Sequence, residues 1–319
     1  MKILVICPDY SDATSYYRAF GTFNDIESRS DIQFTRYESA FSVQQGGNFG
    51  ATWADLIKYD VAFFQRGMGA KSVELCAYLK EMGLKIWYDL DDSLWDIPEQ
   101  YAIKKTYNLS ILETINQLLS MSDLVTCSTI ELKKVIESKV NKTAHVVKNA
   151  WDINRFPIKE FNKEGKVIWR GSSTHISDLR SCGTMLKQIS QSDKIEFWGH
   201  NPINNAPNLS ITNYSYVAPL DPISYFNKIR KDNIKAFLVP LQDTLFNRCK
   251  SNIAWLEATA SGAVTYSNLV GEFSHTLPFE DYFNDIKHEE VYRKFKDNLL
   301  SDYNLTYWNN IRIQLLKQL

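Results

Sequence analysis

The sequence predicts an α/β protein made of two Rossmann-like domains of similar size. Short apolar runs alternate with segments of helical periodicity along the whole chain, which is the pattern of parallel βαβ units. The chain has 319 residues, enough for two domains of ordinary size. A Lys- and Glu-rich stretch with a proline, ending at Lys166, separates two such alternating sets and is typical of a linker.

Six short apolar runs in the first half are the predicted strands. They are Lys2–Cys7, Ile32–Tyr37, Val61–Gln65, Leu84–Asp89, Leu124–Cys127 and His145–Val147. Helices fit between them. Residues 72–82 carry apolar side chains at helical spacing and stop at Gly83. Ser128 and Glu131 predict a capping box that opens a helix ending near Ser138.

The second half repeats the pattern with five predicted strands and five predicted helices. The strands are Val167–Arg170, Ile195–Gly199, Ser210–Asn213, Ala236–Leu241 and Ala263–Tyr266. The helices are His175–Ile189, Pro222–Lys231, Ser251–Ser261, Glu289–Leu300 and Tyr307–Leu316. Open α/β sheets bind ligands at the carboxyl ends of their strands. Two such domains facing each other therefore predict a ligand site in a central cleft.

Composition narrows the class of protein. Hydrophobic residues make up 44% and charged residues 23%, the profile of a soluble globular protein. No apolar run approaches the roughly 18 residues that cross a membrane. The five cysteines are scattered without a C-x-x-C pair, so we expect a reduced cytoplasmic protein without a structural zinc site. A net charge of −1 removes the simplest argument for nucleic-acid binding.

Three polar residues recur at helical spacing in the string FNRCKSNIAWLEATASGAVTY, which starts at Phe246. Lys250 and Glu257 would lie two helical turns apart on one face, with Asn247 preceding a helix that begins near Ser251. The start of that helix, with Lys250, would suit a phosphate, and Glu257 would suit ribose hydroxyls. The alternative is a solvated Lys–Glu face, which the apolar and small neighbours of Glu257 argue against.

A strand–glycine–serine–helix turn, RGSSTH, begins at Arg170. This is the usual position for a loop that cradles a phosphate, so Gly171 and Ser172 are candidate ligand contacts. Arg170 would supply a second cation facing Lys250. The alternative is an ordinary turn with Thr174 as the helix N-cap, which needs no ligand.

Three carboxylates, Asp89, Asp91 and Asp92, stand within four residues at the end of the fourth predicted strand. Crowding should raise the pKa of one of them and make it a proton acceptor near neutral pH. One alternative is a helix N-cap followed by a solvated loop. Another is a metal-binding D-x-D pair of Asp89 and Asp91, typical of single-domain manganese-using sugar transferases, against which the second Rossmann-like half argues.

Arg18 is a further cation near the predicted cleft. It follows the first strand through a loop that contains Ser, Asp and Thr. It could reach the cleft and contact an acceptor or a phosphate, or the first helix could leave it in solvent. The sequence favours neither reading.

Together these motifs resemble the GT-B fold of nucleotide-sugar-dependent glycosyltransferases. The resemblance spans nearly the whole chain in layout. It implies an acceptor-binding Rossmann-like domain over residues 1–150 and a donor-binding one over residues 151–303, facing a central cleft. It also implies that the last helix, residues 304–319, crosses back to the first domain.

The same resemblance implies roles for site residues. Arg170 and Lys250 match the cations that bind the donor diphosphate, and Glu257 matches the carboxylate that holds the donor ribose. Many retaining members carry a second Glu eight positions earlier. That position is Cys249 here, so the E-x7-E signature is absent and the stereochemistry stays open.

Two narrower resemblances suggest different acceptors. YDLDDSLW and WRGSSTHISDL look like bacterial and viral transferases that act on surface polysaccharides. KIWYDLDD, KVIWRGS, KIEFWGHN and AWLEATASGAV look like the phage β-glucosyltransferase that modifies hydroxymethylated cytosine in DNA. In that enzyme the strand ends in an aspartate that acts as the base, and Asp92 falls at this position.

These observations predict a metal-independent hexosyl- or pentosyltransferase that moves sugar from a nucleotide diphosphate sugar, most simply a UDP-sugar, to a hydroxyl acceptor. The acceptor would be a glycan or a modified base of phage DNA, in a bacterial or phage-infected cytoplasm. Asp92, or Asp91 as second choice, would take the acceptor proton, and no cofactor is expected. The alternative is a non-catalytic nucleotide-sugar or phosphate binder. The sequence leaves the oligomeric state open.

Overall fold

The computed structural model describes residues 1–7, 12–36, 53–204, 206 and 209–319. The chain forms two compact units. The first unit comprises residues 1–97, 105–149 and 306–319, and the second unit comprises residues 98–104 and 150–305. Tyr37, the predicted end of the second strand, lies outside the described residues.

The first unit is built on a parallel six-stranded sheet with the order β2-β1-β3-β4-β5-β6. Its strands are β1 Lys2–Ile6, β2 Gln33–Arg36, β3 Val61–Gln65, β4 Lys85–Leu90, β5 Leu124–Cys127 and β6 His145–Val146. The six predicted strands of this half are confirmed, with ends that shift by no more than one residue. The register pairs Gln65 with Asp89, so the carboxyl ends of β3 and β4 lie beside each other.

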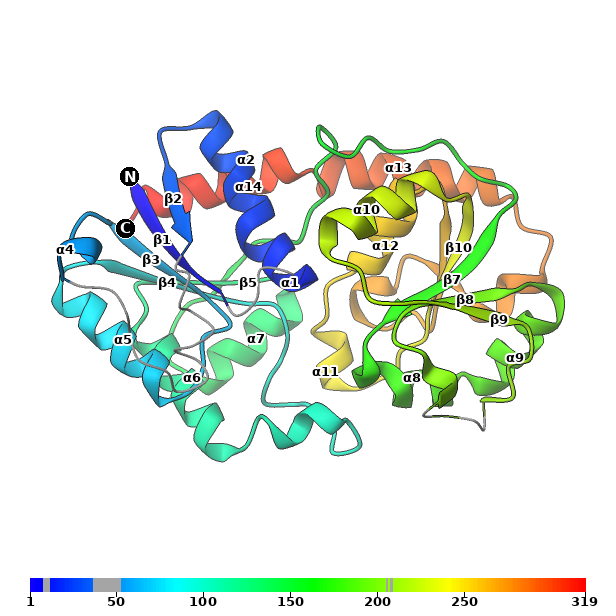
Figure 1. The fold of residues 1–319 in the computed structure, drawn as a ribbon, viewed down its shortest axis with the longest axis horizontal. Coiled ribbons are helices and arrows are strands. Elements are labelled where there is room, and N and C mark those ends of the chain that lie inside the picture. The colour runs from blue at the N-terminus through cyan, green and yellow to red at the C-terminus, as the bar shows by residue number, and fades with distance from the viewer. Residues whose placement is uncertain (8–11, 37–52, 205, 207–208) are drawn as a thin grey trace. The chain divides into compact units, whose positions relative to one another are not determined.

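Helices cover both faces of this sheet. They are α1 Ala13–Ser15, α2 Gly21–Arg29, α4 Trp53–Leu56, α5 Ala70–Glu81, α6 Leu109–Met121, α7 Ile130–Lys139 and α14 Leu305–Leu316, with a π-helical turn at Tyr16–Phe20. The strand order reverses at β1, and right-handed crossovers place helices on opposite faces on either side of such a reversal. Accordingly α2 and α14 lie on one face and α5, α6 and α7 on the other (Figure 1).

The core of the first unit is aromatic at its centre. The ring of Phe23 on α2 lies 5.0 Å from Phe63 on β3 and 5.8 Å from Trp87 on β4. All three side chains are buried. The indole N–H of Trp87 donates to the hydroxyl of Thr126 at 2.7 Å, which satisfies its polar group within the core.

The last helix, α14, packs against α2. Asn309 donates to the carbonyl oxygen of Thr22 at 3.2 Å, and Arg29 donates to the side chain of Asn310 at the same distance. Leu316 is buried in the same apolar cluster as Phe23. Both hydrogen bonds and apolar packing thus hold this carboxyl-terminal segment to the first unit.

The second unit also has a parallel six-stranded sheet, in the order β12-β11-β10-β7-β8-β9. Its strands are β7 Lys166–Gly171, β8 Ile195–Gly199, β9 Tyr214–Val217, β10 Ile234–Val239, β11 Val264–Ser267 and β12 Leu277–Pro278. Its helices are α8 Ile176–Ser181, α9 Gly183–Ser192, α10 Pro222–Lys231, α11 Leu245–Arg248, α12 Ile253–Ala260 and α13 His288–Asp302. α8 and α9 lie on one face, and α10, α12 and α13 on the other (Figure 1).

Three local predictions were wrong. The strand predicted at Ser210–Asn213 begins instead at Tyr214, because Ser210 has a φ of 51°, which breaks an extended chain. Thr129 is the N-cap of α7 and accepts from Leu132, so Ser128 does not form a capping box. The helix predicted from His175 to Ile189 is two helices that meet at Cys182. The two-residue strand β12 was not predicted.

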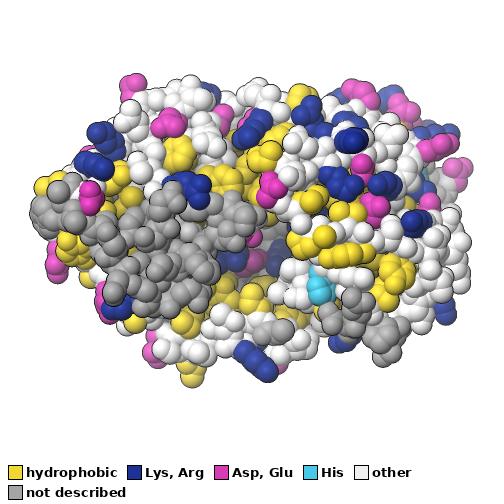
Figure 2. Space-filling model, in the orientation of Figure 1, with side chains coloured by type: hydrophobic (Ala, Val, Ile, Leu, Met, Phe, Trp, Pro, Cys, Tyr) yellow, Lys and Arg dark blue, Asp and Glu magenta, His cyan; other side chains and the backbone are white. Residues whose placement is uncertain are grey.

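No helix of the described residues is long and apolar enough to cross a membrane. All five cysteines are free and buried, and burial raises the pKa of the Cys76 and Cys127 thiols to about 12. On the described part of the face in Figure 2, Lys and Arg side chains are interspersed with Asp and Glu.

Candidate functional site

The predicted donor-site residues of the second unit gather where its strands end. Arg170 and Gly171 are the last residues of β7. Lys250 lies in the break between α11 and α12, so it does not share a helical face with Glu257 as predicted. The physical reason is that α11 ends at Arg248 and α12 starts only at Ile253, which turns the chain between them.

Glu257 on α12 is a buried carboxylate with two polar partners. Its side chain is only 2% exposed. Its Oε2 lies 2.7 Å from Nε of Arg170 and accepts a hydrogen bond from the hydroxyl of Tyr225 on α10 at 2.8 Å. Burial and the charge of Glu257 raise the pKa of Tyr225, which therefore stays a protonated donor. Glu257 is thus not part of a solvated Lys–Glu face, and its position is fixed by Arg170 and Tyr225.

The Gly-Ser turn after β7 is shaped by close packing. A Cβ atom on Gly171 would come within 2.6 Å of the Trp169 ring, so a larger residue would not fit there. The carbonyl oxygen of Gly171 accepts from the amide of His200, and the hydroxyl of Ser172 lies 2.7 Å from that of Thr174. Thr174 is not a helix N-cap, because it lies inside a 3-10 turn that precedes α8.

Asp178 on α8 is the centre of a buried hydrogen-bond network that the sequence did not reveal. Its Oδ1 accepts from the Tyr101 hydroxyl at 2.7 Å, and from the Gln242 amide and the Asn247 side chain at 2.9 Å each. Its Oδ2 lies 3.0 Å from Nδ1 of His175. The His175 contact and these hydrogen bonds outweigh burial and lower the pKa of Asp178, so it is ionised at neutral pH.

This network changes the interpretation of Asn247. Its side chain is fully buried, and its amide nitrogen donates to Asp178 and to the carbonyl oxygen of Gln242. Asn247 therefore supports the loop before Lys250 through its amide nitrogen. Among the described residues its side-chain oxygen has no hydrogen-bond partner, and the predicted contact with the donor stays a prediction.

His175 is a basic group that lies near both predicted cations. Burial lowers its pKa, the nearby charges of Lys250 and Arg170 lower it further, and Asp178 opposes them.

The Nζ of Lys250 lies 4.3 Å from the centre of the Phe246 ring, a cation–π contact that directs this side chain. Ser251 is half-buried and precedes Asn252, the residue before α12. Arg170 and Lys250 are thus the two cations at this edge of the sheet, and His175 is uncharged at neutral pH.

In the first unit, Asp91 and Asp92 share one cation. Arg66 Nη2 lies 2.7 Å from Asp91 Oδ1 and 3.2 Å from Asp92 Oδ2. Arg66 has a φ of 52°, a strained conformation for a residue with a side chain. Burial raises the pKa of Asp91, Arg66 opposes this, and the charge of Asp92 adds to it. The expected crowding of the two carboxylates is therefore present, with Arg66 as a partner that the sequence did not indicate.

Arg18 does not fit its predicted role as a contact to acceptor or phosphate. It is 1% exposed, and its Nε and Nη2 donate to the two carboxylate oxygens of Asp89 at 2.8 and 2.6 Å. The third guanidinium nitrogen, Nη1, donates to the carbonyl oxygen of Val147 at 2.6 Å. The physical reason is that Asp89, itself buried, needs a charged partner within the unit.

Solved structures match this architecture over nearly the whole chain. HepE of Anabaena in complex with UDP-glucose matches with a TM-score of 0.68 and 11% sequence identity over 100% of both chains. BGT of T4 phage in complex with UDP-glucose matches with a TM-score of 0.57 and 14% identity over 98% of this chain and 99% of that one. The fold is that of the GT-B glycosyltransferases.

An epimerase, which is not a glycosyltransferase by name, also matches in structure. UDP-GlcNAc 2-epimerase from Neisseria meningitidis, bound to UDP-GlcNAc, matches with a TM-score of 0.54 and 12% identity over 100% of both chains. No protein-family model and no curated protein matches the sequence. The GT-B prediction is therefore confirmed as a fold, and the activity has to be argued from the residues of the site.

The D-x-D reading of the first unit is not supported by its geometry. Both carboxylate oxygens of Asp89 accept from Arg18, and one also accepts from Thr126 at 2.5 Å. Asp91 faces Arg66 instead of joining Asp89 around a common centre. Within the described ranges, no group of three or more His, Cys, Asp or Glu side chains is arranged to hold a metal ion.

Proposed function

We propose that this protein transfers a glycosyl group from a nucleotide diphosphate sugar to a hydroxyl acceptor, with the second unit binding the donor and the first unit the acceptor. The observation that carries the proposal is the Arg170–Glu257 pair at the carboxyl edge of the second sheet, with Lys250 on the segment that leads into the same helix as Glu257. It combines a buried acceptor of hydrogen bonds with a basic group, as the two ends of a nucleotide diphosphate require.

The donor would be held by charge at one end and by hydrogen bonds at the other. Lys250 and Arg170, with the backbone of Gly171, Ser172 and Ser251, would bind the diphosphate and stabilise the charge that develops on it as the sugar leaves. Glu257 would accept hydrogen bonds from the ribose hydroxyls. Full-length likeness to structures whose ligand is UDP-glucose favours a UDP-sugar as co-substrate.

Asp92 is the better candidate for the general base. The Asp91 side chain is 7% exposed and lies 2.7 Å from Arg66, whereas that of Asp92 is 22% exposed and lies 3.2 Å from the same group. Asp92 is therefore more accessible to a substrate hydroxyl, and Asp91 is the second choice. Arg66 would hold the two carboxylates in place.

The reaction would not need a metal ion. Arg170 and Lys250 would supply the positive charge that a metal otherwise provides at a diphosphate leaving group. A hexosyl or pentosyl group would be equally compatible with these residues. A protein of this kind would act in the cytoplasm of a bacterium or of a phage-infected cell, where nucleotide sugars are made.

The acceptor would be the hydroxyl of a glycan, with a hydroxymethylated base of phage DNA as the second candidate. Interspersed charge on the described face in Figure 2 and a net charge of −1 favour a neutral acceptor, because DNA binding draws on clustered Lys and Arg. Because a T4 phage protein has the same fold, hydroxymethylated DNA is included among the acceptors to be tested.

The test is NMR of a UDP-sugar panel incubated with the protein and with each acceptor class. Transfer predicts acceptor-dependent release of UDP and a new glycosidic signal. Epimerisation, the reaction that the name of the Neisseria relative describes, would produce an altered UDP-sugar without an acceptor. Saturable UDP-sugar binding with neither product would identify a non-catalytic binder.

A further inference from the structure

The second unit has a pocket at the opposite edge of its sheet, where the strands begin. Its volume is about 640 Å³, within the range of roughly 300–1,000 Å³ that is usual for small-molecule sites. Lys235 and Ala236 near the start of β10 and Val264 at the start of β11 form its base. Residues from the end of α9, the 282–283 segment and the first turns of α13 form its walls.

This pocket is separate from the proposed donor site. β10 has six residues, so its two end residues lie about 17 Å apart at roughly 3.3 Å per residue. Arg170 and Lys250 lie at the far edge, where the strands end. None of the residues that line the pocket belongs to the Arg170, Lys250 or Glu257 group. A ligand bound here would therefore be a different one from the donor diphosphate.

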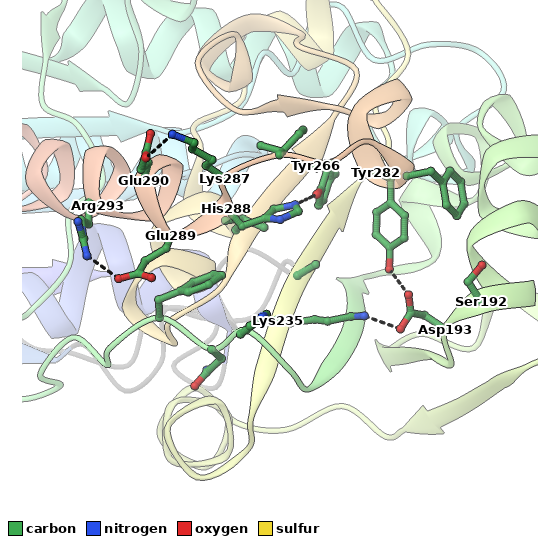
Figure 3. A pocket seen from close by; sticks show the side chains of 17 residues that line it. Ser192, Asp193, Lys235, Tyr266, Tyr282, Lys287, His288, Glu289, Glu290 and Arg293 are labelled. Carbon is green, nitrogen blue, oxygen red and sulfur yellow. Dashed lines mark hydrogen bonds and ion pairs between the residues drawn. The ribbon is translucent and has the colours of Figure 1, made fainter.

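Polar contacts hold the aromatic side chains of the pocket in place (Figure 3). The hydroxyl of Tyr282 donates to Asp193 at 2.8 Å, and the hydroxyl of Tyr266 is hydrogen-bonded to Nε2 of His288. The centres of the two tyrosine rings are 4.9 Å apart, at an interplanar angle of 56°. Fixed rings of this kind offer apolar faces without a loss of side-chain freedom on binding.

Seven charged side chains line the pocket, and six of them form ion pairs with one another, while the seventh, Lys163, is exposed. Lys235 lies 2.5 Å from Asp193 at the base. At the rim, Lys287 pairs with Glu290 and Arg293 pairs with Glu289 (Figure 3). The three carboxylates are thus each neutralised by a basic group, and the excess charge of Lys163 is in contact with solvent. The pocket is therefore suited to a neutral ligand with many hydroxyl groups.

We propose that this pocket binds a neutral saccharide, at a site distinct from that of the donor. A pyranose ring combines an apolar face, which would pack on the half-buried Tyr282, with hydroxyls that would exchange hydrogen bonds with Lys235 and Asp193. The choice of a saccharide over other neutral polyols rests on the proposed glycan acceptor. Such a site would bind a sugar unit of the acceptor chain that is remote from the hydroxyl to which the donor sugar is transferred.

Saturation-transfer NMR of the full chain without any nucleotide sugar tests this directly. Maltose, cellobiose and N,N′-diacetylchitobiose are the probes, each titrated at millimolar concentration. We expect saturable binding of at least one of them. Tyr282→Ala, which removes a ring, and Ser192→Trp, which fills the pocket from an exposed wall position, should each weaken that binding about tenfold or more. Tyr214→Ala, an exposed tyrosine of the same sheet outside the pocket, should not weaken it.

Two results would overturn the proposal. One is the absence of saturable binding for all three probes. The other is binding that survives both Tyr282→Ala and Ser192→Trp, and if Tyr282→Ala fails to fold, survival in Ser192→Trp alone decides. UDP binding measured in the same proteins and in Lys250→Ala reports on the donor site separately. Sugar binding by a wild-type protein that binds no UDP would count against the proposed function and not against this pocket, whereas loss of UDP binding in Lys250→Ala alone is the result that the proposed function predicts.

Discussion

The guanidinium of Arg170 lies 2.7 Å from the carboxylate of Glu257, so the predicted diphosphate cation and the predicted ribose acceptor contact each other. The Glu257 side chain is buried, and that of Arg170 is 28% exposed. A donor molecule would therefore meet a preformed pair whose carboxylate is already oriented by Arg170 and Tyr225. The two residues should act as one unit in binding and in stability.

Glu257→Gln keeps the size of the side chain and removes its charge, and with it the ion pair to Arg170. We expect the free energy of unfolding to fall by about 2 kcal/mol, the scale of a hydrogen bond to a charged group. UDP affinity, measured by calorimetry, should fall about tenfold or more. Glu289→Gln, in the exposed pair with Arg293, is the control and should change neither quantity. UDP affinity that Glu257→Gln leaves unchanged would contradict a role in donor binding.

Lys250→Ala should weaken UDP binding about tenfold, because one charge-assisted contact to the diphosphate is lost. Stability should change little, since the side chain is only half-buried. Lys250→Arg should retain most of the affinity. Lys235→Ala removes a lysine at the opposite edge of the same sheet and serves as the matched control. Equal loss of affinity in Lys250→Ala and Lys235→Ala would show that the effect is one of net charge alone.

Arg18→Met should destabilise the first unit by about 3–5 kcal/mol, because it leaves the buried Asp89 without a charged partner. Urea unfolding measures this. Lys134→Met breaks an exposed pair with Glu131 in the same unit and should cost less than about 1 kcal/mol. A small effect of Arg18→Met, with UDP-sugar turnover lost, would instead favour the substrate contact that the sequence suggested.

The pH dependence of stability should report on His175. Its pKa is lowered in the folded protein, chiefly by burial, so below about pH 6.5 the unfolded chain binds a proton that the folded chain does not. Stability is therefore lost as the pH falls through this window. Asp178, whose pKa is lowered, loses its contribution only below about pH 3.9. His175→Gln should reduce the loss of stability between pH 7.5 and 5 in urea unfolding, and an unchanged slope would contradict this.

The sequence predicted the fold well because both sheets are made of buried parallel strands. Such strands are continuous apolar runs, as at Val61–Gln65 and Ile195–Gly199, and both were placed to the residue. The strand β9 was misplaced because it lies at a sheet edge, where Tyr214 and Tyr216 are exposed and the apolar signal is weak.

The site was harder to predict, for reasons that individual residues illustrate. Lys250 and Glu257 were found from their spacing, but nothing in the local pattern signalled that the helix is interrupted between them. Asp178 was missed because its partners Tyr101 and Asn247 lie 77 and 69 residues away in the chain. The environment of Arg18 stayed open because its partner Asp89 lies 71 residues away in the chain, and burial is a property of the folded unit.

Acceptor-dependent transfer by Asp92→Asn tests the proposed reaction most directly. The comparison is the rate of UDP release with the acceptor found for the wild type, alongside UDP affinity in the same protein. Asp96→Asn, a carboxylate of the same loop that accepts from Ser93, is the matched control. We expect Asp92→Asn to slow transfer by about 100-fold or more, as for loss of a general base, with UDP affinity unchanged. Transfer at the wild-type rate in Asp92→Asn would contradict its role as the base, and no transfer by the wild type to any acceptor class would contradict the proposed function.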